Sequence, residues 1–362
     1  SGINYAVWNW NGGDTDGKTY TVKVVSDSGN KYRFDDFGTS AVTLDLAEGG
    51  TYVFDQSDAS NATHPLRFYT AADKTGGEYT TGVTTSGTAG QAGAYTQIVV
   101  AASAPTLYYQ CSAHAGMGGQ VNTNSTLGSS NFDGSTQSTV KANPTAGFSI
   151  VTYTGQQNAS DTIGHGLGVK PQVVISKSRN ATYTYTQWYV HHHKLTTNYF
   201  AFLNTNAAQG NGLGDYYIDS SFSSTVFAVG DDIYGPNVSN NNYVAYCFSE
   251  VAGYSKFGSY TGNGSSDGTF VFTGFRPAWI MLKRTDTSNN WHIADNKRQN
   301  PFNVVTAQIY PNLVSAEIAQ SDLDIVSNGF KIRNSAAFEN ASGGTYIYLA
   351  FAESPFKYAR AR

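Results

Sequence analysis

The C-terminal part of the sequence contains one block twice in tandem. Residues 243–250 (YVAYCFSE) recur near the end of the chain as residues 346–353 (YIYLAFAE), and residues 257–262 (FGSYTG) match residues 150–155 (IVTYTG). Two further matches are residues 169–177 with residues 275–283, and Trp188 with Trp291. The second copy begins where the first ends, at a separation of about 105 residues, which is the mark of a tandem duplication. We therefore expect two similar structural units in this region.

The composition excludes several classes of function. Charged residues make up 13% of the chain, against about 25% in typical domains, and the net charge is −4. No basic patch is present apart from the short C-terminal end, so we expect no nucleic-acid partner. No apolar run reaches the roughly 20 residues of a membrane helix, so we expect no membrane insertion.

The N-terminal part is dominated by short runs of alternating or β-branched residues, such as residues 20–25 (YTVKVV) and 106–111 (TLYYQC). Clusters of Gly, Asn and Asp separate these runs. This rhythm predicts an all-β sandwich over residues 15–125. Residues 126–147 are rich in Ser, Thr and Asn without apolar periodicity, and we expect them to form a linker.

The two copies of the duplicated block occupy residues 148–252 and 253–362, and each is long enough for its own jelly-roll-like β-sandwich. They could instead be the two halves of one larger sandwich. We favour separate sandwiches that pack together. Within the second copy, residues 315–326 fit a helix weakly, because Leu323 and Ile325 alternate as they would in a strand.

The first residues of the sequence resemble the strands that end each copy. Residues 3–10 (INYAVWNW) form an apolar, aromatic run followed by a loop. We expect residues 1–14 to contain the last strand of a truncated upstream unit. The alternative is an ordinary first strand of the N-terminal sandwich.

Three side chains in the N-terminal part form the one constellation that points to chemistry. Cys111 and His114 make a C-x-x-H motif after an expected strand, and His64 lies upstream of them. A thiolate with two imidazoles is the trigonal ligand set of a blue-copper site, because soft sulfur and borderline nitrogen suit both copper oxidation states. The second cysteine, Cys247, is expected to be a small buried hydrophobe without a disulfide to Cys111.

The same region resembles the cupredoxin family. The likeness covers residues 46–58, 61–68 and 108–119, with His64 in the position of the upstream ligand and Cys111 on the ligand loop. The resemblance implies a Greek-key sandwich that holds copper.

The chain departs from the family at the axial ligand. The axial Met of the family falls at Gly119 here, and Met117 lies two residues earlier. A copper site could lack an axial ligand or use Met117. The alternative is a metal-free fold with a vestigial site, which we favour, so we expect no bound cofactor.

Other candidate residues indicate structure rather than chemistry. His191, His192 and His193 cannot converge on one metal within a strand, because alternate side chains face opposite sides, so we expect a polar strand end at the surface. Glu250 and Glu353 occupy equivalent positions of the two copies, which favours a turn or interface role. We identify no arrangement of a nucleophile with a base, so we expect no enzyme.

The duplicated block resembles a domain family found in structural proteins of tailed phages, especially marine ones. The strings that carry this likeness are GFSIVTYTG (147–155), GHGLGVKP (164–171), KFGSYTGNG (256–264), GFRP (274–277), DNKR (295–298) and AFAESPFK (350–357). The likeness covers residues 148–362 and implies a virion appendage, such as a tail fibre, spike or capsid-surface fibre.

On this resemblance we expect a non-enzymatic virion structural protein at the particle surface that contributes to host attachment. The expected partners are further copies of the chain in a homotrimer, other virion proteins, and a glycan or protein of the host surface. The alternatives are a capsid decoration protein without a receptor role, a copper-binding redox protein, and a secreted cellular adhesin.

Overall fold

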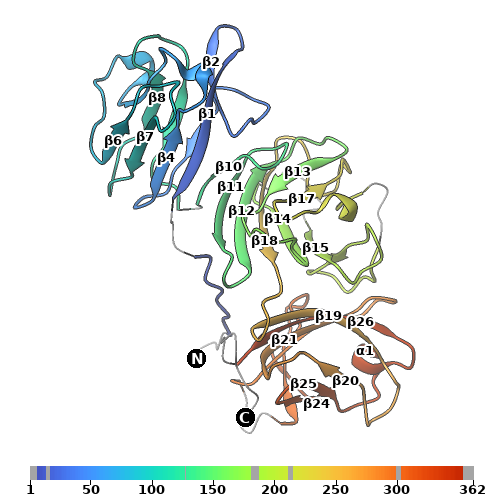
Figure 1. Cartoon of the computed structure of the whole chain (residues 1–362). Coiled ribbons are helices and arrows are strands. Elements are labelled where there is room, and N and C mark those ends of the chain that lie inside the picture. The colour runs from blue at the N-terminus through green and yellow to red at the C-terminus, as the bar shows by residue number, and fades with distance from the viewer. Residues whose placement is uncertain are drawn as a thin grey trace.

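The chain folds into three units of β-sheet that follow one another along the molecule (Figure 1). The computed structural model describes residues 6–13, 17–126, 128–180, 187–210, 215–298 and 303–353. Within these ranges the helical elements are three single turns, η1 (Ala59–Asn61), η2 (Ala72–Lys74) and η3 (Asp219–Ser221), and the short helix α1 (Ala337–Asn340). The expected all-β class is confirmed. No helix in the described ranges has the length and apolar character needed to cross a membrane.

The N-terminal unit encloses one core between two sheets. Their strand orders are β2-β1-β4-β7-β6 and β3-β9-β8-β5. Alternate residues enter the core, as on β4, where Tyr52 and Phe54 are buried between partly exposed neighbours. The strands of this unit are β1 (Lys18–Ser26), β2 (Asn30–Phe34), β3 (Leu44–Asp45), β4 (Thr51–Asp55), β5 (Leu66–Tyr69), β6 (Val83–Ser86), β7 (Tyr95–Val99), β8 (Leu107–Cys111) and β9 (Gly119–Asn122).

The two copies of the duplicated block have the same strand order. The first repeat unit contains β12-β18-β14-β15 within a larger sheet, and the second repeat unit contains β19-β26-β21-β22. All these pairs are antiparallel. The strands of the first unit are β10 (Ser129–Asn131), β11 (Ser138–Asn143), β12 (Phe148–Thr154), β13 (Asp161–Gly164), β14 (Val173–Ser178), β15 (Trp188–His192), β16 (Ala201–Phe202), β17 (Val226–Val229) and β18 (Asn242–Phe248). Those of the second are β19 (Ser255–Thr261), β20 (Phe270–Phe272), β21 (Pro277–Arg284), β22 (Trp291–Asp295), β23 (Val305–Gln308), β24 (Ile318–Val326), β25 (Gly329–Ile332) and β26 (Thr345–Ala352).

A stacked tyrosine pair marks the same place in each repeat unit. Tyr153 on β12 lies opposite Tyr243 on β18, with ring centroids 5.2 Å apart. Tyr260 on β19 lies opposite Tyr346 on β26, with ring centroids 4.8 Å apart. The duplicated sequence is therefore a duplicated set of cross-strand contacts.

The two equivalent sheets pack against each other through a shared core. On β21, Trp279 and Met281 enter this shared core, whereas Ile280 enters the core of the second unit itself. On β14, Val173 enters the shared core and Val174 the core of the first unit. Because successive residues of a strand point to opposite faces, both faces of each sheet are buried. Each repeat unit thus has its own core, and a third core joins the two units.

The prediction that residues 126–147 form a linker is wrong. This stretch contains β10 and β11, which extend the sheet of the first repeat unit, with Val140 opposite Val151 on β12. Phe132, just after β10, enters the core of the N-terminal unit and stacks on Phe34. A hairpin at a sheet edge is held by main-chain hydrogen bonds and needs few apolar residues, so composition did not distinguish it from a linker.

Residues 6–13 do not form the strand that we expected within residues 1–14; residues 1–5 and 14 lie outside the described residues. This segment instead places two tryptophans at the seam between the repeat units. The ring centroid of Trp10 lies 5.5 Å from that of Trp279 and 5.4 Å from that of Phe351. Trp8 contacts the same Trp279 ring. The N-terminal segment therefore covers an edge of the shared core.

The weak helix expected over residues 315–326 is also wrong. Residues 318–326 form β24, with Leu323 and Ile325 both buried. The alternation of these two side chains was the stronger signal, because a strand buries every second residue.

Trp10→Ala tests the contribution of the N-terminal segment. We expect the free energy of unfolding of the repeat units to fall by about 2 kcal/mol, since a half-buried indole is lost from an aromatic core. Chemical denaturation of the whole chain measures this change. Asn9→Ala, at an exposed neighbouring position, is the matched control and should leave stability unchanged. Equal stability of both variants would show that the tryptophans do not hold the seam.

Two buried carboxyl groups share a polar network in the second repeat unit. Glu339 on α1 and Asp322 on β24 are both fully buried. The Asn334 side-chain amide donates to Asp322 Oδ1 at 3.0 Å and to Glu339 Oε2 at 3.1 Å. Gln308 Nε2 donates to Glu339 Oε1 at 3.0 Å and Gln308 Oε1 lies 2.9 Å from His292 Nδ1. Burial raises the pKa of both carboxyl groups, to about 7 for Asp322 and about 8 for Glu339.

This network makes the stability of the second repeat unit depend on pH. The folded state keeps a proton on Glu339 that the unfolded state releases near its ordinary pKa of 4.5. The contribution of Glu339 to stability is therefore fully present below its unfolded pKa and is lost as pH rises through the folded pKa. Burial lowers the pKa of His292 to about 4. This imidazole therefore changes the pH dependence of stability only below about pH 6.5.

Between pH 6.5 and 8.5 we expect the free energy of unfolding to fall by about 2 kcal/mol in the wild type. Glu339→Gln, which keeps the shape without the ionisation, should flatten this dependence. Denaturant titrations at the two pH values measure it. Glu317→Gln, which changes a carboxylate at the surface of the same unit, should keep the wild-type slope. If the Glu339→Gln variant keeps the wild-type pH dependence of stability, another titratable group causes that dependence.

Candidate metal centre

The pairing of two strands brings the three predicted ligands together. Cys111 ends β8, and β8 pairs with β5 so that Cys111 lies opposite Leu66. His64 lies just before β5, on the turn after η1, so it reaches the same end of the sheet. His114 lies on the loop between β8 and β9. A separation of 47 residues between His64 and Cys111 therefore becomes a contact.

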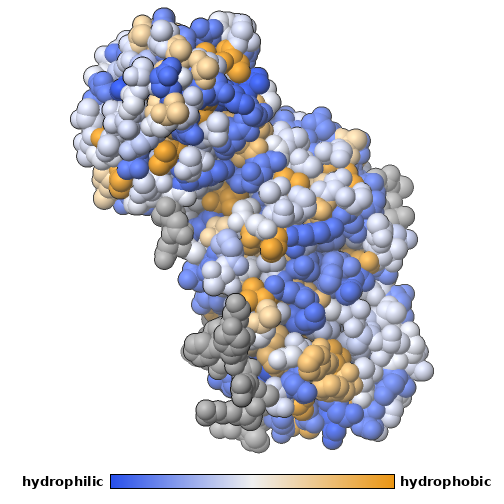
Figure 2. Space-filling model, in the orientation of Figure 1, coloured by the Kyte–Doolittle hydropathy of each residue, from blue (hydrophilic) through white to orange (hydrophobic). Residues whose placement is uncertain are grey.

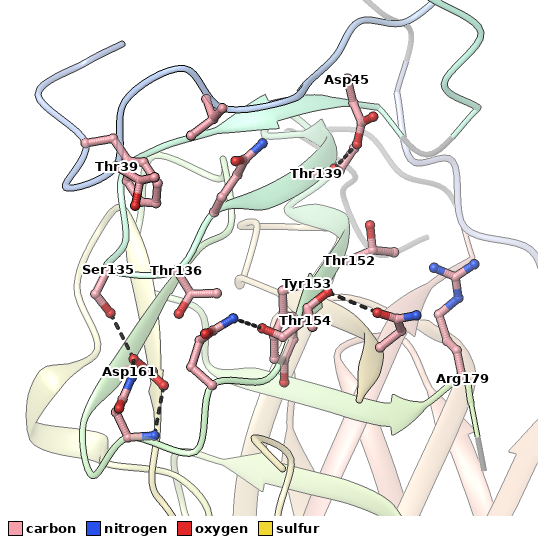
Figure 3. A pocket seen from close by; sticks show the side chains of 16 residues that line it. Thr39, Asp45, Ser135, Thr136, Thr139, Thr152, Tyr153, Thr154, Asp161 and Arg179 are labelled. Atoms are coloured by element: carbon pink, nitrogen blue, oxygen red, sulfur yellow. Dashed lines mark hydrogen bonds between the residues drawn. The ribbon is translucent and has the colours of Figure 1, made fainter. Parts of the chain in front are cut away.

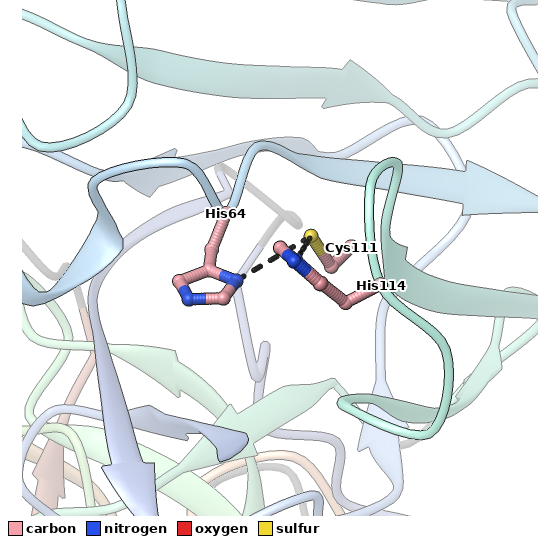
Figure 4. A group of neighbouring side chains, drawn as sticks. All are labelled: His64, Cys111 and His114. Carbon is pink, nitrogen blue, oxygen red and sulfur yellow. Dashed lines mark hydrogen bonds between the residues drawn. The ribbon is translucent and has the colours of Figure 1, made fainter.

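Both imidazoles direct their Nδ1 atoms at the sulfur, as Figure 4 shows. Cys111 Sγ lies 3.7 Å from His64 Nδ1 and 3.5 Å from His114 Nδ1. The three ligand atoms all lie within 4.8 Å of one another. Cys111 is fully buried and His114 is exposed. The group thus lies at the edge of the N-terminal core, with one imidazole facing outward.

Hydrogen bonds fix the turn that carries His64. The His64 carbonyl accepts from the Tyr32 hydroxyl at 2.8 Å and from Gln56 Nε2 at 3.0 Å. Gln56 Oε1 also accepts from the main chain of Leu66, at the start of β5. His64 Nε2 lies 3.5 Å from Asn30 Nδ2. The ring that faces Cys111 is therefore held from β2 and from the loop after β4.

A second glutamine fixes the loop that carries His114. Gln110 Oε1 accepts from the main-chain N–H groups of Met117 and Gly118, at 3.2 and 3.1 Å. Lys31 Nζ donates to the Gly116 carbonyl in the same loop. Three successive residues after His114 are thus tied to β8 and β2. The loop is built to hold its shape.

The protonation of the site suits a metal ion. Burial, followed by repulsion from His114, lowers the pKa of His64, so the ring is neutral at neutral pH. A neutral imidazole is the form that binds a metal. A thiolate with two imidazole nitrogens is the trigonal donor set that favours copper. The residues present therefore fit a copper ion.

Met117 is placed less directly than the other three predicted ligands. Its side chain is buried in the same core as Cys111. The contacts of its main chain are the bond to Gln110 and a bond from the Tyr32 N–H to its carbonyl. Gly119, where the family pattern has its axial Met, lies on β9 opposite Tyr109. An axial role for Met117 remains a hypothesis.

The prediction that residues 191–193 form a polar strand end at the surface is wrong. His191 and His192 are buried. His191 Nδ1 lies 3.1 Å from Asp219 Oδ1 in the first repeat unit. His192 and His193 contact carbonyls of the second unit, since their Nε2 atoms lie 3.2 Å from Tyr348 O and 2.7 Å from Phe257 O. His192 and His193 therefore join the repeat units, and among the described residues the three histidines form no metal-binding group.

The two glutamates at equivalent repeat positions do not meet. Glu250 pairs with Lys256 at 2.8 Å, and Glu353 with Arg276 at 3.4 Å. Each carboxylate therefore has its own ion pair.

The two cysteines are both buried and free, and burial raises the pKa of the Cys247 thiol.

Several supporting residues were not identified from the sequence. Gln56 and Gln110 are buried polar residues next to the predicted metal ligands. In the repeat units, buried Asn237 and Asn340 accept hydrogen bonds from the main chain of Gln156 and Asn263. Their signal was a polar residue where the pattern required an apolar one, but the sequence did not show which loop each would hold.

Comparison with known proteins identifies one domain family. The chain matches the model of a domain of unknown function, DUF7483, over residues 122–355. This range includes both repeat units and the hairpin of β10 and β11. No curated protein and no solved structure gave a significant match. Because the match covers well over half of the sequence, the chain belongs to the DUF7483 family.

Proposed function

We propose that the chain is a non-enzymatic structural protein of a virion, a modular fibre or surface appendage that contributes to host attachment, and that its N-terminal unit binds one copper ion. The observation that carries the copper site is the convergence of Cys111 Sγ with the Nδ1 atoms of His64 and His114. The structural role is supported by the way the repeat units are joined.

The metal ligands have distinct tasks in this proposal. Cys111 binds as a thiolate from the buried side, and His64 binds as a neutral imidazole held by Tyr32 and Gln56. His114 closes the site from the exposed loop. A bound copper ion would supply one-electron chemistry or a structural cross-link between β5, β8 and the loop before β9. The fold that this implies for the N-terminal unit is cupredoxin-like.

The repeat units support a structural role. They share a core of aromatic and aliphatic residues, so they form one stiff body rather than two domains on a hinge. The N-terminal unit is attached to them through Phe132 and through Thr139, whose hydroxyl donates to Asp45 at 2.6 Å. A stiff series of sandwiches suits an appendage that carries load and presents a binding surface. The resemblance of the repeats to phage structural domains points the same way.

Two alternatives are kept. A capsid decoration protein without a receptor role would use the same stiff units in a surface lattice. A copper-binding redox protein would use the N-terminal unit as its functional centre and the repeats as an anchor.

The copper site is tested by Cys111→Ser. We expect the wild type to bind one copper per chain and to show a strong visible absorption from thiolate-to-copper charge transfer. Cys111→Ser should lose this band and keep the fold, as judged by circular dichroism. Cys247→Ala is the matched control, since the second repeat unit already has Ala350 at that position, and it should keep the band. If the wild type binds one copper per chain without showing this band, the copper site lies elsewhere in the protein.

The structural role is tested by the size and location of the protein. Light scattering on the purified chain should give a homotrimer, and antibodies against the chain should label intact virions at the tail tip or a surface fibre. Labelling over the whole capsid lattice would favour the decoration protein. A monomer that binds copper and is absent from virions would favour the redox protein.

A further inference from the structure

A polar cavity of about 610 Å³ lies between the N-terminal unit and the first repeat unit. Thr39 and Asp45 line it from the N-terminal unit, and Thr154 and Arg179 from the repeat unit, as Figure 3 shows. Sites for small ligands commonly have volumes of about 300–1,000 Å³ and often lie where domains meet. The size and position of this cavity are those of a binding site.

Hydrogen bonds between the units fix the walls of the cavity. Gln137 Nε2 donates to the Thr43 carbonyl at 2.8 Å, and Thr139 Oγ1 donates to Asp45 Oδ2 at 2.6 Å. The Asp45 main-chain N–H donates to Ser130 Oγ at 2.8 Å. These bonds join β3 to the hairpin of β10 and β11. The cavity is therefore preformed, and a ligand would not have to order it.

One hydroxyl in the cavity wall has no partner. Thr136 lines the cavity and is 5% exposed. Its Oγ1 makes no hydrogen bond with any residue in the described ranges. A buried hydroxyl without a partner destabilises a protein, because it has lost its hydrogen bonds to water. Less than 1 Å² of this oxygen is accessible, so a ligand in the cavity would reach it only after the Thr136 side chain rotates.

The lining favours a neutral, hydroxyl-rich ligand. Side chains of Thr, Ser, Asn and Gln predominate, and each of these groups can both donate and accept a hydrogen bond. The Asp161 carboxylate already accepts from Asn158 and Asn237. Two carboxylates face one cation, Arg179, so the charge of the lining disfavours an anion. The polar lining also disfavours an apolar ligand.

We propose that this cavity binds a neutral oligosaccharide. Sugar hydroxyls match the donors and acceptors that line the cavity, and rotation of the Thr136 side chain would add its hydroxyl to them. The inference rests on the attachment role proposed above and names the chemical class of the surface that the chain would recognise.

Binding is measured with the intact chain on an array of neutral and acidic bacterial oligosaccharides, followed by calorimetry on each hit. We expect neutral oligosaccharides to bind. Thr136→Val should weaken binding about tenfold, the loss of one hydrogen bond, while thermal stability stays equal or rises because the unpaired hydroxyl is gone. Asn242→Ala, at an exposed position of the lining, should also weaken binding. Thr84→Val, on an exposed strand of the N-terminal unit, is the matched control and should bind like the wild type.

The outcomes separate this inference from the proposed function. No saccharide binding, binding of acidic sugars alone, or hits unaffected by both cavity variants would overturn the assignment, because the cavity would then not be a site for neutral sugars. If antibodies detect the chain on virions but the chain binds no sugar, the structural role stands and the saccharide site is rejected. If the chain binds sugar through Thr136 but is absent from virions, the saccharide site stands and the structural role is rejected.

Discussion

The structure depends on the burial of both faces of two equivalent sheets. Each sheet presents one set of side chains to its own unit and the alternate set to its partner, so that Trp279, Met281 and Phe351 meet Phe248 and Val173 in the shared core. This requirement explains why β14, β22 and β26 are buried at most of their residues. A sheet buried on both faces cannot be exposed without a large loss of apolar contact, so the repeat units are obliged to stay together.

The shared core also organises the parts of the chain that lie far from it in sequence. Trp10 reaches the seam from the N-terminal segment. His192 and His193 reach carbonyls across it from the end of β15. The face of the molecule in Figure 2 is largely hydrophilic, with an apolar patch over the part of the second repeat unit that holds β20, where Phe270 and Phe272 are exposed. The large aromatic residues are otherwise mostly buried, which accounts for an aromatic content of 14% in a chain with few charges.

The candidate site was predictable in part. The C-x-x-H motif and the upstream histidine identified three residues whose ligand atoms the fold brings within 4.8 Å of one another. The side chains that hold them in place, Gln56 and Gln110, were not predictable, because each acts on a loop through a main-chain atom. The saccharide cavity was not predictable either. Its walls come from two units, and nothing in the sequence distinguishes Thr136, whose hydroxyl is buried without a partner among the described residues.

The sequence by itself determined the all-β class and the duplication, because alternation and repetition are local patterns that a strand or a repeat unit must show. It did not determine that residues 126–147 form an edge hairpin, that residues 318–326 form a strand, or that the histidines at 191–193 are buried. Only the tertiary structure decided these points. The conformation of an edge strand and the burial of a polar side chain depend on what packs against them, and here that partner is a distant part of the chain.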